Sequence, residues 1–175
     1  MILPTTELQL PLVRIFSSGG SNLLGTGIPT VSVTAALLGG FFAQPFRVPE
    51  DYDRTREGRL YVVITNANAV GPAAGNVQLE TVRGIAGGGI APTDVTFTTV
   101  QAIPAAWPAN AWIQLEVGSA AAPFIPGGTL SQFGLVGIRP ARNGPAAGDT
   151  WGATLSLFTT VILRYHRLCL HCCGC

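Results

Sequence analysis

The end of the chain gathers the residues best suited to metal or redox chemistry. All four cysteines and one of the two histidines lie there: Cys169, His171, Cys172, Cys173 and Cys175. Thiolate and imidazole are good zinc ligands, but structural zinc sites usually take ligand pairs from two separate turns. We therefore predict no metal site, and interpret the cluster as a tail of reduced or packed thiols. Zinc binding and disulfides between subunits stay as alternatives.

A second group of ionisable residues lies between Pro49 and Arg59, where carboxylates alternate with arginines. Opposite charges in a loop largely neutralise one another, which favours a solvated loop or a charged contact between subunits. A calcium loop is a lesser alternative, because the glycine at the turn of an EF-hand is missing. Its ligands would be Asp51, Asp53 and Glu57.

Catalytic machinery is hard to find in this sequence. His166 stands between Arg164 and Arg167 with no nucleophile elbow to pair with. The glycine-rich run from Gly84 to Gly89 lacks the lysine and the following helix of a phosphate loop. We expect a protein that is not an enzyme, with no catalytic residues and no cofactor.

The tryptophans Trp107, Trp112 and Trp151 suggest either a sugar-stacking platform or anchors of a core or an interface. Trp107 sits in Pro104-Ala105-Ala106-Trp107-Pro108, which predicts an exposed loop. Anchoring is the interpretation that we favour, and Trp107 is predicted to contact another chain.

Composition favours association. Hydrophobic residues make up 47% of the 175 residues and charged residues only 11%, against about 25% charged in an ordinary soluble domain. Such a charge-poor surface is expected to be covered by other chains. The net charge of +1 without a basic run predicts no nucleic-acid binding. Glu7 and two prolines interrupt the apolar N-terminal segment, so we expect neither a signal peptide nor a membrane span.

Prolines and glycines are spread so evenly that helices are excluded and strands expected. Alternation is clear in Val77 to Arg83 and in Ile113 to Val117, which predicts half-buried antiparallel strands. The last run is apolar on both faces, which is typical of a central strand or of one that faces a partner. The fold predicted is all-β, a single antiparallel β-sandwich in jelly-roll or Ig-like order. The expected strands are 30–37, 60–66, 76–83, 94–102, 112–117, 133–139 and 153–166.

Three segments are predicted: an N-terminal arm or interface segment over 1–27, the sandwich over 28–166 and a Cys-rich tail over 167–175. The arm ends in a flexible hinge at Ser17 to Ser21. It would pair with a neighbouring subunit's sheet edge or fold back on its own domain. The residues predicted to lie in an interface are Leu8, Leu10, Leu12, Phe16, Trp107, Phe158 and Ile162.

A set of motifs runs from Phe46 to Trp151, and consists of Phe46-Arg47-Val48-Pro49-Glu50-Asp51-Tyr52-Asp53, then Leu60 to Thr65, Pro126-Gly127-Gly128, Arg139, and Ala147 to Trp151. In these motifs the sequence resembles phage and prophage virion proteins with a β-sandwich domain. The resemblance implies a capsid decoration, head-fibre or tail-associated protein located in the virion. Its partners would be copies of itself, in a homo-oligomer such as a trimer, and a major capsid or tail protein.

The function expected from the sequence is thus a non-enzymatic structural subunit of a phage virion. One alternative keeps the sandwich as a module that binds carbohydrate or a host surface through tryptophan-bearing loops. A second is a self-polymerising extracellular fibre subunit that exchanges its N-terminal strand.

Overall fold

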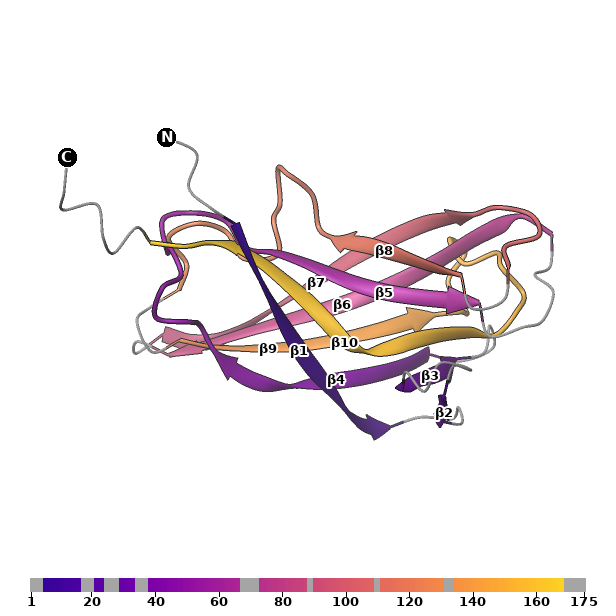
Figure 1. The fold of residues 1–175 in the computed structure, drawn as a ribbon, viewed down its shortest axis with the longest axis horizontal. Coiled ribbons are helices and arrows are strands. Elements are labelled where there is room, and N and C mark those ends of the chain that lie inside the picture. Colours follow the sequence, from indigo (N-terminus) through magenta and orange to yellow (C-terminus); the bar gives the residue numbers. More distant parts are fainter. Residues whose placement is uncertain are drawn as a thin grey trace.

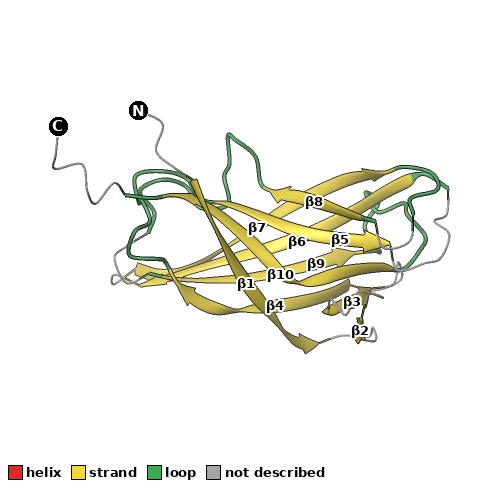
Figure 2. Ribbon diagram, in the orientation of Figure 1, coloured by secondary structure: helices red, strands yellow, loops and turns green. Residues whose placement is uncertain are grey.

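A computed structural model describes residues 5–16, 21–23, 29–33, 38–66, 73–87, 90–108, 111–130 and 134–168. The described residues contain strands and loops and no helix (Figure 2), so none of them forms a helix that could cross a membrane. The strands are β1 (Thr5–Phe16), β2 (Ser21–Leu23), β3 (Pro29–Val33), β4 (Leu38–Arg47), β5 (Arg59–Asn66), β6 (Gly75–Gly87), β7 (Ile90–Ile103), β8 (Trp112–Val117), β9 (Leu135–Asn143) and β10 (Leu155–His166).

The strands form an antiparallel β-sandwich, as the sequence predicts (Figure 1). One layer, sheet A, contains the first half of β1 with β10, β5 and β8, and β2 and β3 extend it. The other layer, sheet B, contains the second half of β1 with β4, β9, β6 and β7.

The pairing pattern gives the sandwich a jelly-roll order. Apart from the short β2 and β3, the first strand pairs with the last (β1 with β10) and the second with the next to last (β4 with β9). The next nested pairs are β5 with β8 and β6 with β7. A long hairpin rolled up on itself produces this nesting, which decides between the two orders that the sequence leaves open.

Strand β1 links the two sheets. Its last partner in sheet A is Thr160, opposite Pro11, and its first in sheet B is Ala43, opposite Leu12. Proline has no N–H to donate to a ladder, so the chain can leave sheet A at Pro11 without breaking a hydrogen bond from that residue. The segment expected to form an arm is therefore paired within its own domain. The predicted hinge lies outside the described residues, except Ser21, which begins β2.

The core lies between the inner faces of the sheets. Leu60, Val62 and Ile64 of β5 point inward and are fully or almost fully buried, and the inward residues of the other strands meet them. Strand β10 has β5 on one side and β1 and β3 on the other, so it is central in sheet A. These pairings confirm the prediction that the last strand is central.

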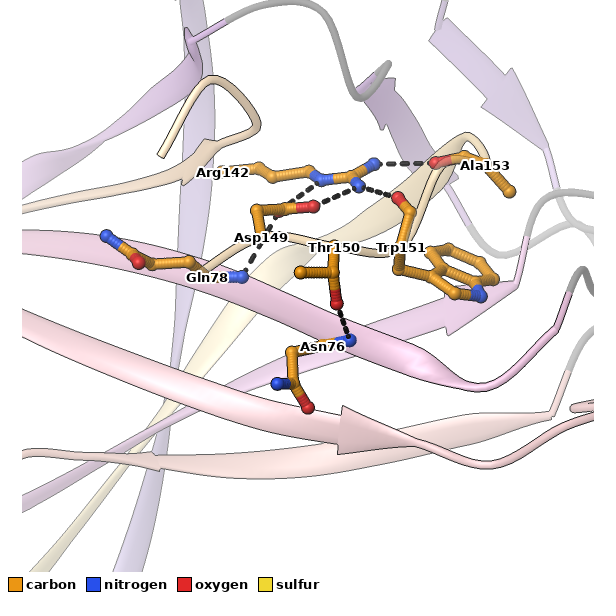
Figure 3. A network of polar contacts seen from close by, with 7 residues as sticks. All are labelled: Asn76, Gln78, Arg142, Asp149, Thr150, Trp151 and Ala153. Carbon is orange, nitrogen blue, oxygen red and sulfur yellow. Dashed lines mark hydrogen bonds and ion pairs between the residues drawn. The ribbon is translucent and has the colours of Figure 1, made fainter. Parts of the chain in front are cut away.

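A buried ion pair closes one end of the sandwich (Figure 3). Arg142 on β9 donates from Nε and Nη2 to the two carboxylate oxygens of Asp149, over 2.8 and 2.7 Å. Its Nη1 bonds the carbonyl of Ala153 at 2.7 Å, and the Asp149 carboxylate also accepts the backbone N–H of Gln78. The backbone N–H of Trp151 donates to the carbonyl of Asn76. These bonds fasten the loop before β10 to strand β6.

Candidate functional site

The outer face of sheet A brings together charged and aromatic residues that are far apart in the sequence. In the antiparallel register Arg59 of β5 lies opposite Arg164 of β10, which in turn lies opposite Glu7 of β1. Tyr61 of β5 lies opposite Glu116 of β8. Residues directly opposite in antiparallel strands project to the same face, so these side chains form one cluster.

Two arginines directly opposite each other would repel, and carboxylates on both sides compensate them. Nε and Nη2 of Arg59 donate to Oε1 of Glu57 at 2.9 and 2.6 Å, and its Nη1 lies 3.4 Å from Oε1 of Glu116. The hydrogen bond to Glu57 raises the pKa of the Arg59 guanidinium. Arg164 binds Glu7 in the same way, because its Nε and Nη2 donate to Oε1 of Glu7 at 3.0 and 2.5 Å.

Arg164 also lies over an aromatic ring. Its guanidinium carbon is 4.8 Å from the ring centroid of Tyr61, and its Nη1 is 3.4 Å from the Tyr61 hydroxyl. The hydrogen bond to Glu7, and to a lesser extent the Tyr61 hydroxyl, raises the pKa of the Arg164 guanidinium. The cation–π contact helps to orient the plane of the guanidinium. The cluster is thus an array of planar donors and acceptors that are linked by hydrogen bonds.

Next to this array the surface is hollowed into a groove of about 300 Å³. We call it the sheet A groove. Its lining combines a carboxylate, two guanidinium groups, hydroxyls and an imidazole, and consists of Thr5, Glu57, Arg59, Tyr61, Arg164, Tyr165 and His166. The ion-paired side chains are between 34% and 51% exposed, so a ligand can reach them from solvent.

Trp112 lies on the same face, at the other end of the strands. It alternates with the inward residues Ile113 and Leu115, pairs with Thr65 and is 63% exposed. Along β5, Thr65 lies four residues beyond Tyr61, about 13 Å at about 3.3 Å per residue. The outer face of sheet A therefore offers an open indole at one end and a polar groove at the other.

The structure separates the three tryptophans that the sequence suggests as a platform. The rings of Trp107 and Trp151 contact each other in the core in a tilted arrangement, with centroids 5.6 Å apart, and both residues are buried. The expectation that Trp107 occupies an exposed loop and contacts another chain is wrong. The prolines do place it in a loop, but its ring fills the sandwich end, and its carbonyl accepts the side-chain N–H of Asn66. Trp112 alone of the three is open to a ligand.

The predicted interface residues have various positions. Leu10 is buried in the core of its own chain, which corrects its assignment to an exposed interface, and Leu8 packs partly buried against that core. Ile162 is half-buried opposite Tyr61, on the outer face of sheet A. Three lie on described strands, but their side chains are outside what the structure describes: Leu12, Phe16 and Phe158.

In the acidic loop, each of the three carboxylates considered as calcium ligands has hydrogen-bond partners within the protein. Asp51 accepts hydrogen bonds from Tyr165 and Arg167, Asp53 from the backbone and hydroxyl of Thr55, and Glu57 from Arg59. The three carboxylates thus serve separate partners, and the described residues contain no group of three or more acidic, cysteine or histidine side chains placed to hold a metal ion. The tail residues Cys169, His171, Cys172, Cys173 and Cys175 lie outside the described part of the chain.

Sequence reasoning missed the role of Arg59, Tyr61 and Arg164. The alternation of the sequence indicates their direction, because each of these residues is next to a buried leucine, Leu60 or Leu163, and must point away from the core. Their neighbourhood depends on pairings between strands more than a hundred residues apart in the chain, and alternation does not encode these pairings.

No protein-family model and no curated protein sequence matches this chain. Among solved structures, a putative glycoside hydrolase from Bacteroides thetaiotaomicron aligns over 82% of this chain and 56% of its own length, with 10% identity and a TM-score of 0.43. TmCBM61, solved in complex with β-1,4-galactotriose, aligns over 94% and 89% with 9% identity and a TM-score of 0.36. CtCBM11 aligns over 96% and 91% with 12% identity and a TM-score of 0.40. At such identities and TM-scores, these likenesses carry no argument about what this chain binds.

Proposed function

We propose that this chain is a non-catalytic β-sandwich module that binds carbohydrate on the outer face of sheet A. The observation that carries the proposal is the combination of the exposed Trp112 with the sheet A groove on one face. Jelly-roll folds serve many unrelated functions, so the proposal rests on the residues of this face and not on the fold.

Sugar hydroxyls both donate and accept hydrogen bonds, so a sugar site needs both kinds of partner in fixed positions. Nε and Nη2 of Arg59 donate to one oxygen, Oε1 of Glu57, which lines the sheet A groove, and those of Arg164 donate to Oε1 of Glu7 on the neighbouring strand β1. Among the described residues, neither fork uses Oε2 of its carboxylate, and this oxygen can accept from a ligand hydroxyl. Exposed ion pairs contribute only about 0–1 kcal/mol to stability, so their main contribution here is geometry.

Trp112 supplies what the groove lacks. The CH-rich face of a pyranose is apolar and packs well on an aromatic ring. Tyr61 cannot offer its ring, because Arg164 covers it. An oligosaccharide lying along β5 would stack one sugar ring on the Trp112 indole and place another sugar ring over the sheet A groove.

The groove favours binding over catalysis. Glycoside hydrolysis uses two carboxyl groups, one of which gives a proton to the leaving oxygen. Glu57 and Glu7 are each held by an arginine, an arrangement that presents carboxylates as acceptors.

The first test is retention of the protein in gels that contain soluble galactan, xylan, arabinan, β-glucan or an acidic polysaccharide. We expect at least one of these polymers to retard the wild type. Trp112→Ala should weaken that binding by about tenfold, the loss of about 1.4 kcal/mol of stacking. Leu135→Ala is the matched control, since Leu135 is also an exposed apolar residue but belongs to sheet B. Equal losses in both variants, or no retention by any polymer, would refute the proposal.

A virion subunit, which the sequence resemblance implies, is the second candidate. The low share of charged residues favours it, together with the exposed Val95 and Val100 on β7. The mass of the native species discriminates, because a lattice subunit must form large assemblies, whereas a binding module can act as a monomer or a dimer.

A further inference from the structure

Strand β7 ends sheet B and pairs, among the described strands, only with β6. An edge strand presents a row of unpaired N–H and C=O groups to any strand that approaches it. The ladder with β6 runs without a break from Gly75 opposite Ile103 to Ile85 opposite Thr93. The open edge therefore follows this regular ladder, and at its end the Ala102 carbonyl is bonded to the Gln101 side chain.

Natural edge strands are usually protected by charges, prolines, bulges or shortness. From Val95 to Ile103 strand β7 has no charged residue and no proline, and the only register shift of its ladder lies near the hairpin end, beyond Ile85. By contrast, β8 at the edge of sheet A is only six residues long and carries Glu116. Val95 and Val100 are exposed on opposite faces of β7, so apolar side chains flank the open edge.

Contacts on the inner face of β7 hold the strand against the core. The ring of Phe97 lies 5.4 Å from that of Phe124, and the buried Arg83 lies over it, also at 5.4 Å. The Arg83 guanidinium in addition bonds the Phe124 carbonyl. Whatever joins sheet B at this edge meets an ordered strand.

One hydrogen bond shows which backbone groups face outward. The carbonyl of Ala102 accepts the side-chain N–H of Gln101 at 2.8 Å, which indicates that Ala102 turns its backbone groups away from β6. Because these groups alternate in direction along a strand, those of Thr96, Thr98 and Val100 also face the open edge.

We propose that the partner of this edge is β7 of a second copy, paired antiparallel about a two-fold axis at Thr98. In this register Thr98 faces Thr98, Thr96 faces Val100, and Asp94 faces the uncharged Ala102, so no like charges meet. Threonine pairs are favourable cross-strand neighbours, and a two-fold axis makes the contact self-complementary. The two B sheets then form one continuous sheet, and both sheet A grooves stay open.

Charge substitutions at the axis test the pairing directly. Thr98→Lys places two introduced lysines opposite each other, and Thr98→Glu does the same with carboxylates, so each variant should dimerise at least about tenfold more weakly. An equimolar mixture of the two variants should regain the dimer, because opposite charges then meet. Sedimentation at micromolar concentration reads the state directly, as the monomer has a mass of 18.2 kDa.

Ala120→Lys, on an exposed loop, is the matched control and should leave the dimer intact. A monomeric wild type overturns the proposal, and so does a dimer that survives both single substitutions. Failure of the mixture to regain the dimer also excludes this register. None of these outcomes bears on glycan binding, which belongs to the opposite sheet.

Discussion

Arg142 and Asp149 form an ion pair whose side chains are 0% and 1% exposed. Removing one partner of a buried pair leaves the other charge uncompensated, which costs about 3–5 kcal/mol. We therefore expect Asp149→Asn to lower the free energy of unfolding by that amount in urea titrations. Asp94→Asn, which changes an exposed carboxylate on β7, should have no measurable effect. If both variants unfold at the same urea concentration as the wild type, the ion pair does not close the sandwich as described.

Asp53 links stability to pH. Hydrogen bonds from the hydroxyl and the backbone N–H of Thr55 lower the pKa of this carboxyl from its ordinary value of 3.8. A pKa that is lower in the folded state adds stability above about pH 4, and this stability is lost as the pH falls through the folded-state pKa. Asp53→Asn should therefore lose less stability than the wild type between about pH 6 and about pH 3. Identical losses, measured by thermal unfolding at both pH values, would contradict this assignment.

At the scale of elements, β1 is the strand on which both sheets depend. Its residue Leu10 points into the core and is buried, whereas its neighbour Gln9 is exposed. We expect Leu10→Ala to cost about 2–4 kcal/mol of unfolding free energy. Gln9→Ala should cost less than about 0.5 kcal/mol. A small effect of Leu10→Ala would mean that the segment detaches as an arm, the other arrangement that its sequence allows.

Periodicity reveals some strands and hides others, for local reasons. Val77 to Arg83 and Ile113 to Val117 alternate because one face of each strand meets the core, and both are strands in the structure. Strand β4 escapes prediction because Gly39-Gly40 and Pro45 act as breakers in its sequence. Pairing with β1 and β9 keeps it extended all the same, and its register shifts between Ala43 and Phe46, next to that proline.

At the scale of the whole molecule, the sequence predicts a sandwich but not the order of its strands. The order depends on pairs such as β1 with β10, which join the two ends of the described chain. The sheet A groove has the same origin, since Glu7, Arg59 and Arg164 meet only after these pairings form. The exposure of the tryptophans also could not be predicted, because composition does not indicate that Trp107 is buried and Trp112 exposed.

The central claim is that a glycan occupies the outer face of sheet A. The most direct measurement is a titration of isotopically labelled protein with oligosaccharides of the polymer that retains it, followed by amide and indole chemical shifts. We predict that the shifts change at the Trp112 indole and at outward residues of β5, β8 and β10, with Tyr61 and Arg164 among them. Changes confined to sheet B, or spectra that do not respond to saturating ligand, would contradict the account.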